Sequence, residues 1–158
     1  MTVRTLTESL TVWRIGDPNG RFPIYSPEGA SLVEGRWHRK GQEVIYTGEH
    51  YGTVMLEKLA HYNGVLPSNQ HFIDIHIAAG VSYEVATKDS LPGWDDLDGA
   101  VARGFGEMWI DQGRSGILFV PSVVSREERN VIINVNHADA ANIKPGQESP
   151  IRWDQRLF

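Results

Sequence analysis

The sequence contains no cysteine among its 158 residues. This absence excludes disulfide bonds and thiolate metal ligands, and it fits a reducing compartment. No hydrophobic run approaches the length of a membrane-spanning helix, and Met1–Leu10 is too polar for the apolar core of a signal peptide. We therefore expect a cytoplasmic protein with no membrane partner.

Positive charge is scarce. The chain has 15 lysines and arginines against 20 aspartates and glutamates, which gives a net charge of −5. A domain that binds nucleic acid normally carries the opposite sign, so we expect no direct nucleic-acid partner. If this acidic protein binds an anionic ligand, it must hold its positive charge locally, on a few arginines.

The common nucleotide and metal motifs are also missing. The string Gly104-Phe105-Gly106 is followed by Trp109 where a dinucleotide fingerprint needs a third glycine. No Gly-Lys-Ser or Gly-Lys-Thr of a P-loop occurs, and Gly113-Arg114-Ser115-Gly116 is one residue too short for a nucleophile elbow. The six histidines show no familiar ligand spacing, so we expect no metal.

The length and a hydrophobic fraction of 41% predict one globular domain, residues 1–158, with a real core. Short strand patterns predominate, without a regular βαβ alternation, which predicts an α+β class with a mixed or antiparallel sheet. The predicted strands are Leu10–Ile15, Glu43–Thr47, Phe72–Ile77, Ser82–Ala86, Gly116–Val120, Asn130–Asn136 and Ile151–Phe158.

Two helices are predicted. In the first, Thr53 is the expected N-cap, Gly64 the expected end, and the apolar positions recur at helical spacing. These apolar positions are Met55, Leu56, Leu59 and Tyr62. The second helix is predicted over Asp98–Gln112, although Gly104 and Gly106 weaken it. Between the strands, Ile15–Leu32 is rich in Gly, Pro and Ser and is predicted to be a long surface loop near a site.

Four short motifs each place one polar or ionisable side chain at the edge of an apolar segment. They are Gly35-Arg36-Trp37-His38, Ile45-Tyr46-Thr47, Met55-Leu56-Glu57 and Val120-Pro121-Ser122. Burying such groups costs free energy, so they need partners or a purpose. An arginine, a tyrosine, a glutamate and a serine can together bind an anion, stack on a flat ring and stabilise a developing cation. This combination suits work on a nucleotide.

Each motif also has an ordinary structural interpretation. Glu57 could be a solvated helix residue paired with His61 or Lys58, and Arg36 could stack on Trp37 at the surface. In the same way, Tyr46 could belong to the core and Ser122 to a turn. Arg14, which follows Trp13, is either a second phosphate ligand or a charge at a strand edge.

The sequence resembles the RES-domain toxins of bacterial type II toxin–antitoxin pairs. The arginine, glutamate and serine that give this family its name correspond to Arg36, Glu57 and Ser122. The likeness covers nearly the whole chain. It includes Trp13-Arg14, Val44-Ile45-Tyr46, Gly106-Glu107-Met108-Trp109, Asn130-Val131-Ile132-Ile133-Asn134 and Asp154-Gln155-Arg156-Leu157. Glu34 departs from the pattern, because the family more often has glycine at this position.

The resemblance implies a fold like that of the diphtheria-toxin-type ADP-ribosyltransferases, in which a split sheet holds NAD. It also implies NAD cleavage, growth arrest and a cognate antitoxin that often carries a DNA-binding domain. The ADP-ribose acceptor stays open among water, phosphate and a target protein. The alternative is a non-enzymatic module that binds a nucleotide or a partner through the same cleft.

Breaking the nicotinamide–ribose bond passes through an oxocarbenium-like state, which a nearby carboxylate stabilises. We expect Glu57 to supply that carboxylate and Arg36 to hold the pyrophosphate through its planar fork. Tyr46 would stack on the nicotinamide, and Ser122 would bind the ribose or orient Glu57.

Inhibition by the partner is expected to occur at the NAD cleft. We expect Arg14, Arg36 and Arg39 to form a basic rim there. An acidic segment or C-terminal carboxylate of the antitoxin could lodge at this rim and block NAD.

Overall fold

The computed structural model describes residues 2–63, 65 and 68–158. These residues form one sheet, three α-helices and two short 3-10 helices. The strands are β1 (Arg4–Thr5), β2 (Leu10–Gly16), β3 (Val44–Gly48), β4 (His71–Ile77), β5 (Ser82–Val85), β6 (Ile117–Pro121), β7 (Arg129–Asn134), β8 (Ile143–Pro145) and β9 (Ser149–Pro150). The helices are α1 (Glu28–Leu32), α2 (Tyr51–His61), α3 (Ala100–Asp111), η1 (Ala138–Asn142) and η2 (Gln155–Leu157).

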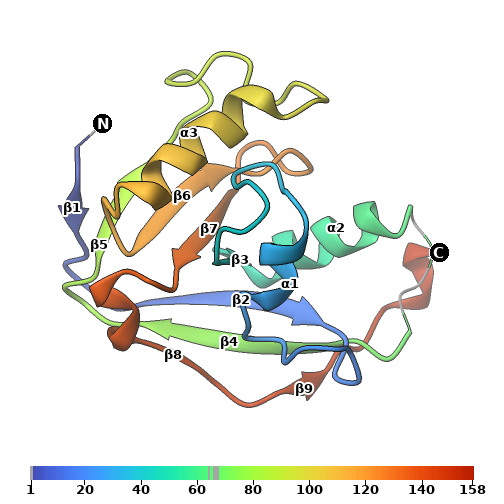
Figure 1. The fold of residues 1–158 in the computed structure, drawn as a ribbon. Helices are drawn as coiled ribbons and strands as arrows, with labels where there is room; N and C mark the ends of the chain where they lie inside the picture. The colour runs from blue at the N-terminus through green and yellow to red at the C-terminus, as the bar shows by residue number, and fades with distance from the viewer. Residues whose placement is uncertain (1, 64, 66–67) are drawn as a thin grey trace.

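The sheet is mixed and split. Its strand order is β1-β5-β6-β7-β3-β2-β4-β8, with β9 paired to β4, and only β5 and β6 run parallel. While β2 pairs with β4 along the whole of Leu10–Gly16, it meets β3 only at Trp13 and Gly48. In Figure 1 the two parts separate into β2, β4, β8 and β9 below and β5, β6 and β7 above. The predicted α+β class with a split sheet is therefore confirmed.

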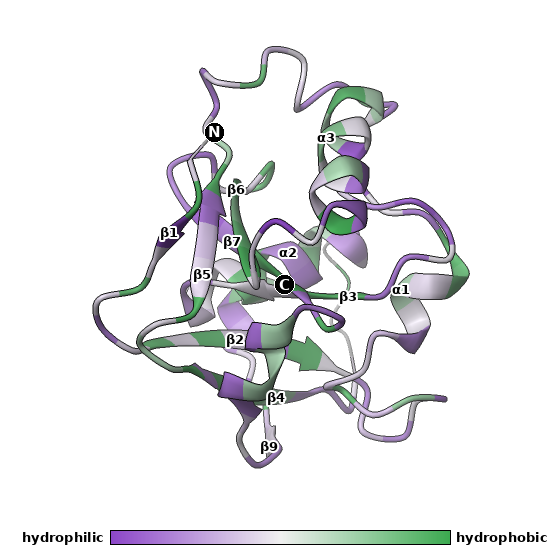
Figure 2. Ribbon diagram, turned by 60° about the vertical axis from the view of Figure 1, so that its left-hand side comes forward, coloured by the Kyte–Doolittle hydropathy of each residue, from purple (hydrophilic) through white to green (hydrophobic). Residues whose placement is uncertain are grey.

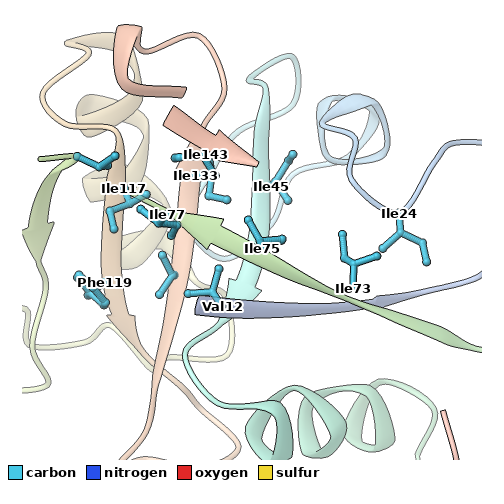
Figure 3. Packing of buried hydrophobic residues seen from close by; sticks show 12 residues of the cluster. Val12, Ile24, Ile45, Ile73, Ile75, Ile77, Ile117, Phe119, Ile133 and Ile143 are labelled. Atoms are coloured by element: carbon cyan, nitrogen blue, oxygen red, sulfur yellow. The ribbon is translucent and has the colours of Figure 1, made fainter. Parts of the chain in front are cut away.

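Apolar side chains of the two parts of the sheet share one core. Figure 3 shows isoleucines from β3, β4, β6 and β7 meeting Val12 of β2. The predicted alternation in β4 is confirmed, since Ile73, Ile75 and Ile77 are all buried. Each fully buried side chain of this kind contributes about 1.5–3 kcal/mol. In Figure 2 the hydrophobic colour follows β3, β6 and β7, whose buried side chains belong to this core.

The second cluster lies between α3 and the sheet. Trp109 and Ala102 of α3 are fully buried and pack with Trp37, Leu118 and Ile132. The helix approaches the Gly35–His38 motif closely at Gly106, where an added Cβ would lie 1.7 Å from the carbonyl oxygen of Trp37. Gly106 thus replaces a better helix former because only glycine permits this approach.

We predict that Gly106→Ala destabilises the protein by up to about 3 kcal/mol, because the backbone of Trp37 must move to admit the methyl group. The matched control is Gly104→Ala in the same helix, where an added Cβ meets nothing within 4 Å. That change should stabilise the protein by about 0.5–1 kcal/mol through helix propensity. Urea unfolding of both variants is the measurement, and equal effects would contradict the proposed steric role.

The start of α2 differs from the sequence prediction. His50 occupies the N-cap position, and no side chain caps the helix there. Thr53 lies inside the first turn, buried, and its hydroxyl donates to Glu128 Oε1 at 3.0 Å. Its hydroxyl thus binds a carboxylate in the loop between β6 and β7 and does not cap the helix. The helix ends at His61, while the predicted end at Gly64 lies outside the described residues.

Leu56 was wrongly placed on the apolar face of this helix. It is 45% exposed, because the inward face of α2 turns Val54 and Glu57 toward a cavity instead. Tyr62, the last of the predicted apolar positions, follows the end of the helix and is 40% exposed, whereas Met55 and Leu59 are half-buried.

Two further segments differ from the prediction in their secondary structure. Ile151–Phe158 forms no strand, and its last residues make the 3-10 turn η2, in which the Asp154 carboxylate accepts from the Arg156 N–H at 2.9 Å. The predicted loop Ile15–Leu32 contains α1, whose start is fixed by a hydrogen bond from the Glu28 N–H to Ser26 Oγ. None of the helices in the described part of the chain is long and apolar enough to cross a membrane.

Candidate active site

A cavity of about 240 Å³ opens where the sheet splits. β2 and β3 share a single residue pair, and α2 packs against both strands. Side chains from β2, β3, α2 and β7 line this cavity, which we call the β2-side pocket. Its lining residues are Arg14, Ile15, Tyr46, Thr47, Gly48, Val54, Glu57, Lys58, His61 and Asn130.

A second cavity of about 270 Å³ adjoins the first. We call it the α3-side pocket, because its walls come from the Gly35–His38 motif beneath α3 and from the end of β6. Its lining residues are Arg36, Trp37, Tyr46, Glu57, Val120, Pro121, Val123 and Asn130. Tyr46, Glu57 and Asn130 line both pockets and therefore mark their junction.

Glu57 is held at this junction by two donors. The hydroxyl of Ser122 donates to Glu57 Oε1 at 2.7 Å, and Asn130 Nδ2 donates to the same oxygen at 2.9 Å. Within the part of the chain that the structure describes, Oε2 has no hydrogen-bond partner. Neither His61 nor Lys58 forms an ion pair with Glu57 there, so the ordinary interpretation of a surface helix pair does not apply. One oxygen is fixed and the other remains available to a ligand.

Ser122 is fully buried at the end of β6, and its Oγ also accepts the N–H of Ser125 at 3.0 Å. Because the hydroxyl accepts from Ser125, its own proton is directed to Glu57. This contact matches one of the two roles predicted for Ser122, the orientation of Glu57.

We predict that Ser122→Ala lowers the rate of any Glu57-dependent reaction about 3- to 10-fold, the effect of losing one hydrogen bond worth about 0.5–1.5 kcal/mol. Asn130 still holds Oε1 in this variant, which limits the loss. Ser122→Thr keeps the hydroxyl and is the comparison. Steady-state kinetics should show the change in kcat, and a rise in KM beside it would indicate that Ser122 also binds the ribose. An unaltered kcat would show that the orientation of Glu57 by Ser122 does not contribute to the reaction.

Tyr46 forms the wall between the two pockets. Its hydroxyl accepts the N–H of Trp37 at 3.1 Å and lies 2.6 Å from His38 Nδ1. His38 Nε2 faces the carbonyl oxygens of Ala30 and Val33, so Nε2 carries the proton and Nδ1 accepts from Tyr46. Burial raises the pKa of Tyr46, which keeps this hydroxyl protonated. The hydroxyl is thus fixed by two contacts, and Tyr46 lines both pockets.

Arg36 lies in the α3-side pocket without stacking on Trp37. The Trp37 indole is 2% exposed and packs edge-on against Phe105. Arg36 Nη1 donates to the carbonyl oxygens of Trp94 and Asp96 at 3.0 and 2.9 Å. These two bonds attach the wall of the pocket to the loop that precedes α3.

Arg14 crosses the split in the sheet. From β2, its Nε donates to the carbonyl oxygen of Ile24 at 2.6 Å and its Nη1 to that of Tyr46 on β3 at 2.8 Å. Burial lowers the pKa of this guanidinium. Arg14 is therefore part of the cavity wall and is not simply a charge at a strand edge.

The predicted basic rim is formed only in part. Arg14 and Arg36 line the adjoining pockets, but Arg39 pairs with Asp111 at the end of α3 and lines neither pocket. Its guanidinium donates to both carboxylate oxygens of Asp111, which also accepts from Gln42 Nε2, and this pairing holds Arg39 away from the cleft. Glu34 lies 3.5 Å from Arg103 and is largely exposed, so its charge is directed to that arginine.

Asn130, Lys58 and His61 line the β2-side pocket, although none of them was predicted as a site residue. Asn130 is the second residue of the apolar strand β7, and a polar residue at this place was a usable signal. Lys58 and His61 were predicted only as surface partners of Glu57. No cluster of three or more histidine, aspartate or glutamate side chains suited to a metal ion occurs among the described residues.

Comparison with known proteins gives consistent relatives. The chain is 37% identical over 153 residues to the Prs ADP-ribosylating toxin of Sphingobium sp. (strain YBL2), covering 92% of this chain and 95% of that protein. It is 28% identical to a Toxin Res of Pseudomonas putida KT2440, covering 94% of this chain and 100% of that protein. The crystal structure of the M. tuberculosis MbcT–MbcA toxin–antitoxin complex contains a chain with the same fold, with a TM-score of 0.75 at 15% identity. That likeness covers 93% of this chain and 86% of the other.

The model of the RES domain family matches residues 11–154, nearly the whole chain. Of the three residues that give the family its name, Glu57 lies at the junction, Ser122 donates to it and Arg36 lines the α3-side pocket. The protein belongs to the RES domain family.

Proposed function

We propose that this protein is the toxin of a toxin–antitoxin pair and that residues 1–158 act as one NAD-cleaving domain. The observation that carries the proposal is the carboxylate of Glu57, fixed through one oxygen by Ser122 and Asn130 where two pockets meet. A purely binding module gains nothing from a carboxylate beside an anionic ligand. The relative named Prs ADP-ribosylating toxin supports a reaction that uses NAD.

The reaction breaks the bond between the nicotinamide nitrogen and C1′ of the ribose. The electron pair leaves with the ring, which departs neutral, and positive charge develops on the ribose. Glu57 would lie beside the bound substrate, where it would stabilise that charge and accept a hydrogen bond from a ribose hydroxyl. Its two fixed donors hold the carboxylate in place before the reaction, so little reorganisation is needed.

Tyr46 and Arg36 would prepare the substrate. The Tyr46 ring would stack on the nicotinamide and set its angle to the ribose. Arg36, Arg14 and Ser122 are the other proposed NAD-binding residues. Since Arg36 Nη1 already holds two carbonyl oxygens, its remaining N–H groups are those available to the substrate.

The acceptor of ADP-ribose can be water, phosphate or a protein side chain, since all three attack the same cation. The name of the Sphingobium relative favours a protein acceptor. Growth arrest would follow either from loss of NAD in the cytoplasm or from modification of the target.

The partner would be an antitoxin that blocks the NAD cleft, in keeping with the complex in which the neighbouring fold was solved. We propose an antitoxin that also carries a DNA-binding domain. The basic groups that it could reach with an acidic segment are Arg14 and Arg36.

The test is to incubate the purified protein with NAD and to measure free nicotinamide by chromatography. Label transferred from radioactive NAD to bacterial proteins would identify transfer, whereas free ADP-ribose or its phosphorylated form would identify water or phosphate as acceptor. If NAD binds but nicotinamide never appears, with or without extract, the protein is the non-enzymatic module and the proposal fails.

A further inference from the structure

Three basic side chains line the β2-side pocket. Arg14 enters from β2, while Lys58 and His61 enter from α2, one residue and one helical turn after Glu57. The catalytic proposal above makes no use of Lys58 or His61. Glu57 is the one carboxylate among the described residues that line this pocket, and its Oε1 is already bound by Ser122 and Asn130.

The two strongest cations of the pocket have no carboxylate partner in the described part of the chain. Arg14 donates only to carbonyl oxygens, those of Ile24 and Tyr46. Lys58 makes no ion pair there, and its ammonium lies 6.0 Å from the Tyr62 ring centre. Burial and then the charge of Arg14 lower the pKa of Lys58. Two half-buried like charges repel, so a ligand with negative charge would relieve an unfavourable arrangement.

The α3-side pocket differs in charge, since one basic side chain lines it against three in the β2-side pocket. Its walls include Trp37, Val120 and Val123, and its one arginine, Arg36, already has two carbonyl oxygens beside its Nη1. The nicotinamide ring of NAD is flat and itself positively charged, so it is repelled more by the three basic side chains of the β2-side pocket than by Arg36 alone, and aromatic faces favour it. The two pockets therefore suit the two ends of the substrate on either side of Glu57.

From this arrangement we infer that Lys58 is a further NAD-binding residue, which together with Arg14 binds the diphosphate in the β2-side pocket. The inference rests on the proposed function for its substrate. In this arrangement the diphosphate lies on the β2 side of Glu57 and not beside Arg36, where the sequence predicted it. Arg36 then shapes the nicotinamide pocket through the carbonyl oxygens that it holds. The bond to be broken would lie at the junction, beside the carboxylate.

The experiment measures binding of ADP, which carries the diphosphate but no nicotinamide, by calorimetry. All proteins are made in a Glu57→Gln background, so that toxicity does not limit expression. Lys58→Met should weaken ADP binding about tenfold, because a charge-assisted contact is lost while the side-chain length is kept. Lys58→Arg should restore most of the affinity. Lys40→Met removes the same charge from an exposed lysine that lines neither pocket and should leave the affinity unchanged.

The outcomes of these measurements distinguish the inference about Lys58 from the proposed function. If Lys58→Met binds ADP as tightly as its parent, or if Arg36→Ala alone loses ADP affinity, the inference is overturned. Nicotinamide release by the protein with native Glu57 tests the proposed function independently. Release together with a Lys58 effect supports both. Without release, a Lys58 effect would overturn the proposed function and identify an anion site of a binding protein.

Discussion

Replacing Glu57 with glutamine should lower the rate of nicotinamide release from NAD by about 10²–10³-fold, the effect of removing one preorganised electrostatic group. Glutamine keeps an oxygen that can accept from Ser122 Oγ and Asn130 Nδ2, so the side chain should stay in place. The charge that stabilises the ribose cation is lost, while the cavity keeps its shape. Toxicity on expression should disappear together with the activity.

The measurement is single-turnover release of nicotinamide, with NAD affinity determined by calorimetry on the same preparation. Unfolding in urea should show that Glu57→Gln remains folded. The matched control is Glu43→Gln, which removes one negative charge from an exposed position that lines neither pocket. Full activity of the Glu57 variant would exclude this carboxylate from the mechanism.

Replacing Arg36 with alanine should weaken NAD binding by about 1.5–3 kcal/mol, roughly 10–150-fold in Kd. Two effects contribute to this loss. The guanidinium no longer reaches the substrate, and the carbonyl oxygens of Trp94 and Asp96 lose their donor, so the wall of the α3-side pocket is released. We therefore expect both KM and kcat to suffer, in contrast to the Glu57 variant.

Calorimetry with NAD is the measurement for Arg36→Ala, and Arg152→Ala is the control. Arg152 is exposed near the end of the chain and takes part in no ion pair among the described residues. Equal NAD affinity of wild type and Arg36→Ala would show that Arg36 is a structural residue without a role in ligand binding.

Several elements could be predicted from the sequence because their signal is local. The six strands from β2 to β7 follow apolar or alternating patterns, and α3 follows its apolar spacing through two glycines. Gly106 shows the limit of local rules. Propensity treats it as a weakness of the helix, whereas its reason is the backbone of Trp37, far away in sequence.

The site was predictable in its residue types and less so in their contacts. Contact with Glu57 was one of two roles expected for Ser122, and its hydroxyl donates to that carboxylate. The hydrogen bonds from Arg36 to the loop before α3 join residues about sixty positions apart, and no sequence pattern predicts them. The same holds for Thr53, which capping rules place at a helix start but which finds the carboxylate of Glu128 instead. Tertiary partners override local preference at each of these positions.

The two donors of Glu57 also set the moment during synthesis at which the protein can first act. Ser122 follows Glu57 by 65 residues and Asn130 by 73. At about 5–20 residues per second, a ribosome needs roughly 4–15 s to make this stretch. Until then the nascent chain carries the carboxylate without the strands β6 and β7 that fix it. The site is therefore incomplete for several seconds after Glu57 has been added to the chain.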